Sequence, residues 1–475
     1  MSDDSTNFTR ILGQGDVLAI AFGAMIGFGW IVLTGGFIND AGTLGAALAF
    51  VIGGIVIGFI GLTYAELVSA MPSAGGEHHY VLRAIGSRAA FVTSWALVLG
   101  YISVVAFEAV ALPQTMLYLF PDLLTGKLWS VAGYDVYLSW AAVGVGAAVV
   151  MTWLNYRGVR PAAAFQGIAV LFLVAVGVVL LTGSFVGGSS THMQPLFTGG
   201  AAGVISVLVA VPFLFVGFDV IPQSAEEIKL PFRKIGQLLL VSVGLAVFWY
   251  VMIMITVGSS MPAVDLASSD LAAADGMAAL WGSDVMGTVL VLGGIAGILT
   301  SWNGFLIGAS RLLYAMAESG MLPRWFGRVH PRYRTPSNAL LFIGGLSALA
   351  PLFGQKMLIW LVDAGGFSLI ISYAMVALSF VLLRRREPQM ERPFRAPGGS
   401  KTGIIAAVLA TGLGLLFLPG MPAALIWPYE WLILLAWAAA GLVLILRVPR
   451  VGHGPNAHQE MTRRAAARGR VLDGS

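Results

Sequence analysis

The chain has 475 residues, of which 58% are hydrophobic and 11% are charged, and its formal net charge is +4. Soluble domains carry about 25% charged residues, so this composition excludes a soluble protein and indicates a surface that lipid solvates. The sequence contains no cysteine, which excludes disulfides, thiolate metal sites and cysteine nucleophiles. The small net charge gives no indication of a nucleic acid partner.

The N-terminal segment, residues 1–15, is polar and carries Asp3 and Asp4. A cleavable signal peptide would have a short apolar core with basic residues before it. We therefore predict a cytoplasmic N-terminal segment followed by a first membrane span that is retained.

Apolar segments recur twelve times along the chain. A helix needs ~20 mostly apolar residues to span a bilayer. The predicted spans lie near residues 16–38, 44–71, 91–119, 137–154, 162–185, 203–222, 237–258, 285–314, 338–353, 357–383, 402–419 and 429–446. The connection 259–284 is expected to be acidic and solvent-facing, and the basic tail, 447–475, is expected to be disordered.

Lysine and arginine mark one side of this predicted bundle. If the N-terminus is cytoplasmic, all of the 27 basic residues except Lys127 and Lys356 fall in cytoplasmic segments. Cytoplasmic loops carry such an excess of Lys and Arg. One missed span would scramble the later loops, so the asymmetry supports twelve spans with both termini on the cytoplasmic side of the cell (inner) membrane.

Two predicted spans contain residues that favour an interrupted helix. The first span reads Gly-Ala-Met-Ile-Gly-Phe-Gly-Trp over residues 23–30, and the sixth contains Pro212 and Gly217. Glycine lowers the cost of unwinding, and proline removes a helix donor. Interrupted helices at corresponding positions of two halves are typical of inverted-repeat transporters. The alternative is that these glycines only permit close helix packing.

Four motifs resemble the amino acid–polyamine–organocation superfamily of transporters. They are Ile26-Gly27-Phe28-Gly29, then Tyr64-Ala65-Glu66-Leu67 with Pro72-Ser73-Ala74-Gly75-Gly76, then Gly217-Phe218-Asp219 with Ala225-Glu226-Glu227, and lastly Ser310-Arg311-Leu312-Leu313-Tyr314. The resemblance covers roughly residues 15 to 400 in the family's order, and the four motifs together make it specific.

The resemblance implies an all-α integral membrane protein with the five-plus-five inverted-repeat (LeuT-like) fold and broken helices 1 and 6. The first repeat would be residues 16–185 and the second 203–383, with peripheral helices at 402–446. The substrate site implied at the two breaks would use Met25, Ile26, Gly27, Phe28, Gly29, Trp30, Phe213, Phe215, Val216, Gly217 and Phe218.

This sequence departs from the family pattern at two informative places. Phe28 replaces the usual Ser or Thr, so one hydroxyl near the expected carboxylate site is missing. Some relatives carry a lysine in span five that imitates a sodium ion, but residues 162–185 contain none. That route to proton coupling is therefore not supported.

Ionisable and polar residues inside the predicted spans are functional candidates, because burying charge in a membrane is costly. Glu108 either pairs with a substrate ammonium group or carries a proton, or it is a neutral structural residue. Asn303 either lines the site or bonds to another helix. Asp219, Glu226, Glu227 and Arg233 are candidates for coupling or gating, although Asp219 also suits capping of a half-helix.

These observations predict a secondary active transporter that moves amino acids or small organic amines by alternating access, with a preference for cationic substrates. A polyamine or monoamine importer or exchanger is the alternative, and an ion channel or a nutrient sensor with the same fold is an alternative of another class. No P-loop motif is present, which excludes a built-in ATPase. We predict no enzyme activity, no cofactor and no metal site. The expected partners are the substrate, a coupling proton or sodium ion, and membrane lipid.

Overall fold

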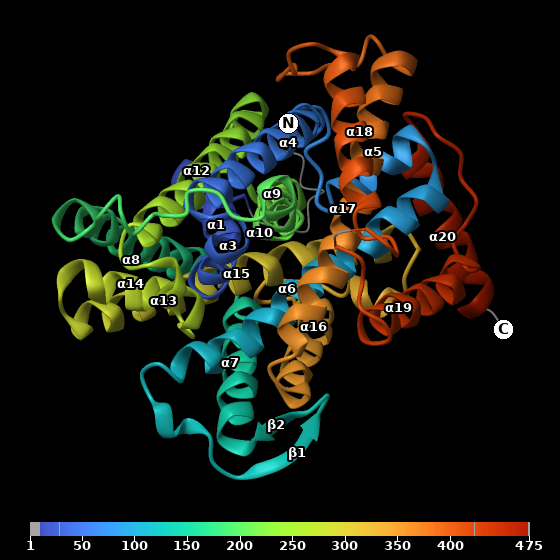
Figure 1. Ribbon diagram of the computed structural model, residues 1–475. Helices are drawn as coiled ribbons and strands as arrows, with labels where there is room; N and C mark the ends of the chain where they lie inside the picture. The colour runs from blue at the N-terminus through green and yellow to red at the C-terminus, as the bar shows by residue number, and fades with distance from the viewer. Residues whose placement is uncertain (1–9, 28, 422, 474–475) are drawn as a thin grey trace.

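Long apolar helices dominate the computed structural model, which describes residues 10–27, 29–421 and 423–473 (Figure 1). Within these residues, seven helices are long and apolar enough to cross a membrane. They are α4 (Thr43–Ala70), α6 (Ser87–Met116), α7 (Leu138–Tyr156), α8 (Val159–Val186), α12 (Phe232–Gly258), α15 (Asp284–Glu318) and α17 (Met357–Arg386). The protein is therefore a multi-pass membrane protein.

The first and sixth predicted spans are both interrupted. The first contains α1 (Gln14–Met25), α2 (Gly29–Val32) and α3 (Thr34–Ala41), and the sixth contains α9 (Gly200–Leu208), α10 (Val211–Leu214) and α11 (Val220–Gln223). Gly217 has a φ of +134° between α10 and α11, a conformation that glycine adopts without strain. The expected interruptions therefore occur at the positions that the glycine pattern indicated.

Three predicted spans form shorter helices. They are α16 (Ser337–Leu349), which continues into the 3-10 helix η4 (Ala350–Phe353), α18 (Ser400–Leu415) and α19 (Tyr429–Ile445). These helices have 13, 16 and 17 residues, which is less than the ~20 that a straight span needs. The total of twelve spans therefore stays a prediction.

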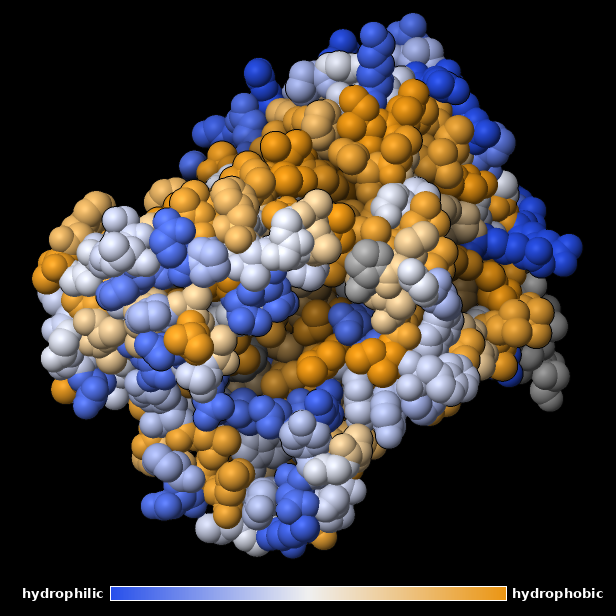
Figure 2. All heavy atoms as spheres, in the orientation of Figure 1, coloured by the Kyte–Doolittle hydropathy of each residue, from blue (hydrophilic) through white to orange (hydrophobic). Residues whose placement is uncertain are grey.

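Hydrophobic side chains cover much of the outer surface (Figure 2). On α8, Ile168 and Leu171 are 73% and 72% exposed, and Leu442 of α19 is 65% exposed. In water such broad apolar exposure would promote association, whereas in a bilayer it faces acyl chains. By contrast, α6 lies almost entirely inside the bundle, against α15 and α17.

Two segments outside the predicted spans are helical. The connection after α12 forms α13 (Ala263–Ser268) and α14 (Ala272–Trp281), and small and apolar residues pack α14 against α15. The acidic side chains of this connection face solvent as expected, since Asp265, Asp270 and Asp284 are exposed. The tail forms α20 (Ala457–Asp473), so the expectation of disorder is wrong, because Ala457 and Met461 bury against the bundle.

The connections define two opposite faces of the molecule. The hairpin of β1 (Lys127–Val131) and β2 (Tyr134–Tyr137) precedes α7, and the far end of that helix, Tyr156, packs on Tyr333 at 6.0 Å. We call the hairpin side the hairpin face. The other side, here called the terminal face, holds residues 10–13, α5 (Glu77–Ala84), α20 and the short helices η2 (Ala225–Glu227) and η3 (Arg324–Gly327). The short helix η1 (Pro121–Leu123) precedes the hairpin.

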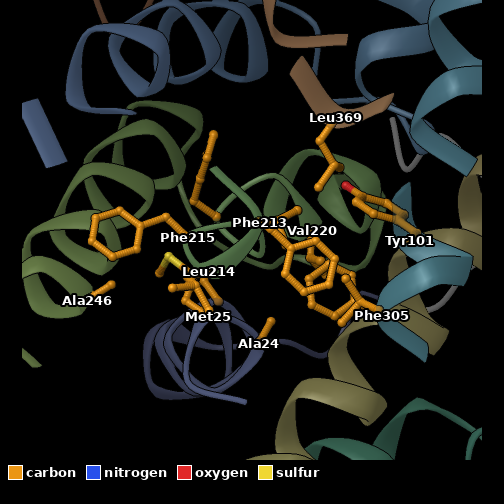
Figure 3. Close-up of a cluster of buried hydrophobic side chains, with 14 of the residues drawn as sticks. Ala24, Met25, Tyr101, Phe213, Leu214, Phe215, Val220, Ala246, Phe305 and Leu369 are labelled. Atoms are coloured by element: carbon orange, nitrogen blue, oxygen red, sulfur yellow. The ribbon is translucent and has the colours of Figure 1, made fainter. Parts of the chain in front are cut away.

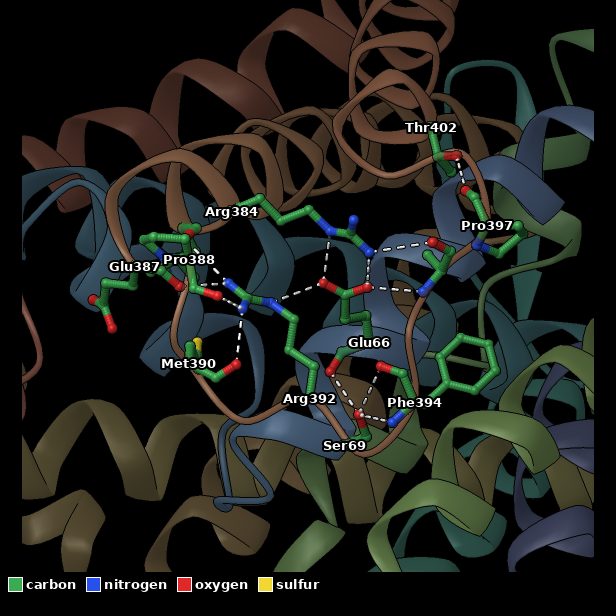
Figure 4. Close-up of polar contacts among 12 residues, drawn as sticks. Glu66, Ser69, Arg384, Glu387, Pro388, Met390, Arg392, Phe394, Pro397 and Thr402 are labelled. Atoms are coloured by element: carbon green, nitrogen blue, oxygen red, sulfur yellow. Dashed lines mark hydrogen bonds and ion pairs between the residues drawn. The ribbon is translucent and has the colours of Figure 1, made fainter.

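Glu66 ties α4 to the segment after α17 (Figure 4). Its carboxylate accepts hydrogen bonds from Arg384 Nε at 2.9 Å and from the Ala396 backbone N–H at 2.8 Å, and it pairs with Arg392 Nε at 3.0 Å. Pairing of this kind offsets the cost of burying an ionised carboxylate. This contact fixes the terminal ends of α4 and α17.

Candidate functional site

A small closed cavity lies where the interruptions of the first and sixth spans meet, in a region that Figure 3 shows from one side. Its volume is about 20 Å³, enough for at most one water molecule. The lining residues are Ala24, Met25, Gly27, Gly29, Val104, Phe107, Glu108, Phe213, Leu214, Val216, Tyr250, Ser301 and Phe305. The walls are mainly apolar, with Glu108 as the acidic member.

Glu108 lies against the backbone of the first interruption. Its side chain is 1% exposed, and a methyl group at Gly27 would overlap its Oε1. The same methyl group would come within 2.9 Å of Ser301 Oγ. Glycine at position 27 therefore lets a carboxylate from α6 approach the unwound main chain of span one, where a side chain would exclude it.

A pair of aromatic rings separates this cavity from a larger one toward the hairpin face. Phe107 and Phe213 meet edge to face, with ring centroids 5.7 Å apart. Phe107 also lines the larger cavity, which has a volume of about 350 Å³ and includes Lys356 and Asp363. Figure 2 shows a hollow near the centre of its view. The inner cavity is thus closed on this side by two side chains that rotamer changes can separate.

Six of the residues predicted for the substrate site line the inner cavity. They are Met25, Gly27, Gly29, Glu108, Phe213 and Val216. Phe28 lies outside the described residues. Gly217 packs against the first interruption instead, and a Cβ there would lie 2.8 Å from the Met25 backbone nitrogen.

The structure places the other predicted aromatic residues away from the inner cavity. Trp30 is fully buried against Trp249, with ring centroids 5.4 Å apart. Phe215 packs on Tyr250 at 5.4 Å, and Phe218 packs between Tyr64 and Tyr373. These side chains hold the interrupted segments in place rather than lining the cavity. Ile26 is also buried in the core, and its carbonyl faces Gly297.

Asn303 joins three helices instead of facing the inner cavity. Its amide donates to Gln166 Oε1 at 2.8 Å and to the Ala162 carbonyl at 3.1 Å, and its Oδ1 accepts from Asn155 at 2.8 Å. These partners come from α7 and α8. Of the two roles considered for Asn303, the structure supports the hydrogen bond between helices.

An ion pair on the terminal face involves Glu227. Its carboxylate accepts from Arg311 Nε at 2.7 Å, and both side chains are almost completely buried. Its backbone carbonyl accepts from the N–H groups of Ile11 and Leu12, both at 2.9 Å. The sequence placed Arg233 near Glu227, but Arg233 is exposed. The partner, Arg311, lay unrecognised within the motif Ser310-Arg311-Leu312.

Glu226 and Asp219 make separate contacts. Glu226 accepts a hydrogen bond from the Ala74 backbone N–H at 3.0 Å, and burial raises the pKa of its carboxyl. Asp219 is fully buried, and its Oδ1 accepts from the Gly217 N–H at 2.8 Å. Asp219 stands at the N-cap position of α11 but makes no side-chain hydrogen bond to that helix, so the capping role considered for it is not seen; its carboxylate instead binds the backbone of the interruption that precedes it.

Seven residues that line the cavity were not predicted as site residues from the sequence: Ala24, Val104, Phe107, Leu214, Tyr250, Ser301 and Phe305. Tyr250 donates a hydrogen bond from its hydroxyl to the Met25 carbonyl at 3.1 Å, which satisfies a backbone group that the interruption frees. A lone tyrosine in an apolar span was the available signal for it. Among the described residues, no group of three His, Asp or Glu side chains is placed to hold a metal ion.

Comparison with known proteins gives matches over most of the chain. The amino acid permease family matches residues 12–444. The chain is 28% identical to the branched-chain amino acid permease BcaP of Bacillus subtilis, over 82% of this chain and 84% of that protein. It is 26% identical to the methylthioribose transporter of the same organism, over 93% of each. It is 30% identical to the vacuolar cationic amino acid transporter 2 of Arabidopsis thaliana, over 81% of this chain and 61% of that protein. The chain therefore belongs to the amino acid permease family.

Proposed function

We propose that this protein is a secondary active transporter that carries amino acids, with a preference for cationic ones, through a site between the interrupted spans. The observation that carries the proposal is Glu108, a buried carboxylate in the wall of a closed, mainly apolar cavity. An ionised carboxylate in an apolar wall attracts a group of opposite charge. The ammonium group of an amino acid has that charge, and a second, cationic side-chain group adds to it.

The position of Glu108 favours an amine at the first interruption. In an interrupted span, free backbone N–H groups attract an anion such as a substrate carboxylate. Here Glu108 already lies against the backbone at Gly27. Ring faces of Phe107 and Phe213 add attraction for a cation. Relatives of this chain are named as transporters of branched-chain amino acids, cationic amino acids and aspartate, so family membership alone does not select the substrate.

The architecture proposed for this function has twelve spans in two inverted repeats of five, with two peripheral helices. The interruptions support it, because they lie in the first and sixth predicted spans and meet at one cavity. The proposed location is the cell membrane, with the terminal face toward the cytoplasm. The lysine and arginine distribution supports this orientation.

Alternating access requires both ends of the site to open. A volume of about 20 Å³ cannot hold an amino acid, so substrate entry requires the cavity to enlarge. On the hairpin side, Phe107 and Phe213 form the barrier; on the terminal side, we assign a gating role to Glu226, Asp219 and the Glu227–Arg311 ion pair. Arg233 is exposed and takes part only if it moves toward this ion pair.

The decisive test is uptake of radiolabelled L-lysine and L-leucine into proteoliposomes by wild type and by the Glu108→Gln variant. Loss of the charge with the shape kept should lower L-lysine uptake at least about tenfold, since about 1.4 kcal/mol of binding free energy corresponds to that factor. Asp270→Asn, at an exposed position on the hairpin side, is the control and should leave uptake unchanged. Equal L-lysine uptake by wild type and Glu108→Gln would contradict the proposed role.

The same assay separates the alternatives. A carrier shows saturable uptake that substrate on the opposite side accelerates, whereas an ion channel does not. Putrescine in place of L-lysine tests the amine alternative, because putrescine has no carboxylate. If the protein transports putrescine but no amino acid, its substrate is an amine and the proposal of an amino acid substrate is wrong.

A further inference from the structure

Two carboxylates that the substrate site does not use lie buried together on the terminal side of the sixth-span interruption. Asp219 precedes α11, and Glu77 is the first residue of α5. Both side chains are 0% exposed. The charge of Asp219 acts on Glu77, although the two residues come from different halves of the molecule. Neither lines the inner cavity or the cavity toward the hairpin face.

Each carboxylate has one oxygen in a hydrogen bond and one without. Asp219 Oδ1 accepts from Gly217, and the Gln223 side-chain amide donates to Glu77 Oε2. Asp219 Oδ2 and Glu77 Oε1 have no hydrogen-bond partner within the described structure. A buried carboxylate oxygen without a hydrogen-bond partner is energetically costly. A ligand that binds at these two oxygens would therefore gain the most binding free energy.

No positive charge balances the pair. Among the described residues, neither carboxylate forms an ion pair with Lys, Arg or His. His78, which follows Glu77, faces away toward the hydroxyl groups of Ser94 at 3.2 Å and Ser319 at 2.7 Å. The titratable groups that face the carboxylates from the surrounding helices are the phenols of Tyr64, Tyr80, Tyr101 and Tyr373.

The tyrosine hydroxyls around the pair are buried and unpartnered. Tyr64 on α4, Tyr101 on α6 and Tyr373 on α17 are all 0% exposed, and none of their hydroxyls completes a hydrogen bond in the described structure. Tyr101 faces Asp219, and Tyr64 faces Glu77. Figure 3 shows Tyr101 beside this part of the core. Small movements would let these phenols donate to a carboxylate that has become charged.

From this geometry we propose that Glu77 and Asp219 form a proton-binding site, in which the pair holds one proton and releases it during transport. Two buried like charges without a counter-ion resist ionising together, so in the closed arrangement one carboxyl keeps a proton. Burial and the charge of Asp219 raise the pKa of Glu77, which lies outside the spanning helices. When the proton leaves to water, the remaining dianion is stabilised by the tyrosine hydroxyls.

The pair is placed to link its proton to the closure of the terminal face. Glu77 begins α5, and Gly75 just before it donates to the Gln223 carbonyl at 3.4 Å. Gly76 lies so close to Pro222 that a Cβ would come within 2.6 Å of the ring. A charged Glu77 binds the Gln223 amide more strongly than a neutral one. Protonation therefore weakens the contact between α5 and α11, and proton release restores it.

A proton fits this site better than a metal cation. A proton adds no volume, whereas sodium or a divalent cation needs a cavity lined by several oxygens. The carboxylates border neither of the cavities described here. The ligand is therefore assigned as a proton that accompanies the substrate, and this assignment rests on the proposed transport function.

The first test uses purified protein without substrate, so it does not depend on the proposed substrate. Infrared spectra recorded across a pH titration report protonated carboxyl groups directly. Wild type should retain a protonated carboxyl at neutral pH. In Glu77→Gln and in Asp219→Asn, the infrared signal of this carboxyl should either disappear or titrate at a pH lower by about one unit or more. Asp270→Asn should leave the titration unchanged. Identical titrations in wild type and both pair variants would overturn the site.

The second test links the site to transport in proteoliposomes. An imposed pH gradient should drive accumulation of L-lysine by wild type. Glu77→Gln should accumulate at least about tenfold less L-lysine than wild type, a factor that corresponds to about 1.4 kcal/mol. L-lysine counterflow, which needs no net proton movement, should fall far less. Accumulation that follows a sodium gradient and ignores pH would overturn the proton site. If the proton site is overturned in this way but L-lysine counterflow is intact, the proposed transport function is still supported.

Discussion

Glycine at the interruptions decides which side chains can approach the unwound main chain. At position 27 it admits Glu108, and at position 217 it allows a φ of +134° together with close packing on Met25. The sequence indicated both glycines and Glu108 as site residues. It did not indicate that Glu108 faces Gly27, because the two lie in different spans and only packing brings them together.

Replacement of Gly27 by valine should abolish transport without preventing insertion. The added side chain would displace both Glu108 and Ser301, and overpacking of this kind costs about 1–3 kcal/mol. Uptake and membrane yield measured together check this expectation. Gly146→Val is the matched control, since Gly146 is exposed on α7 with no atom near its Cβ position. Normal uptake by Gly27→Val would contradict the site at the interruption.

At the scale of elements, the tail after α19 makes specific contacts that its composition did not indicate. Ser87 Oγ donates to the Pro449 carbonyl at 2.7 Å, and the Gly454 N–H donates to the Arg83 carbonyl at 2.9 Å. His458 of α20 lies over His79 of α5, with ring centroids 4.7 Å apart. The basic, Gly- and Ala-rich tail suggested disorder because few apolar residues mark its buried face.

Acidification should release this tail from α5. Burial and the neighbouring His458 lower the pKa of His79 to about 3, and burial also lowers the pKa of His458. Both rings are therefore neutral when docked, whereas free histidine titrates near pH 6.5. Docking is fully stable above about pH 6.5 and weakens as the pH falls below it, because the released state binds the protons.

A spin label at position 463 measures this release, and the absence of native cysteine makes the single substitution Arg463→Cys sufficient. The label should become more mobile as the pH falls from 7.5 toward 5.5, roughly one unit below the usual histidine pKa. His458→Gln should remove most of the pH response. A response that is identical with and without His458 would assign the release to another group.

At the scale of the whole molecule, the lysine and arginine asymmetry predicts orientation. The terminal face, with α20, should face the cytoplasm, and Asp270 on the opposite side should face outward. Membrane-impermeant maleimide applied to intact cells should label Asp270→Cys and should label Arg463→Cys only after permeabilisation. The opposite labelling pattern would show that the protein is inserted in the reverse orientation.

The sequence by itself indicated that lipid surrounds this protein, that the protein is helical and which family it resembles. Those properties follow from composition, from apolar runs near the bilayer thickness and from local motifs, all of which are read along the chain. It also indicated where the spans are interrupted, because glycine and proline act locally.

Only the tertiary structure decided which of the marked residues meet. It separated Trp30, Phe215 and Phe218 from the inner cavity and gave Glu227 the partner Arg311. It also joined Glu77 to Gln223, 146 residues away. Contacts between helices depend on how each helix is rotated and packed, and nearly all-apolar spans carry too little periodicity to reveal that rotation.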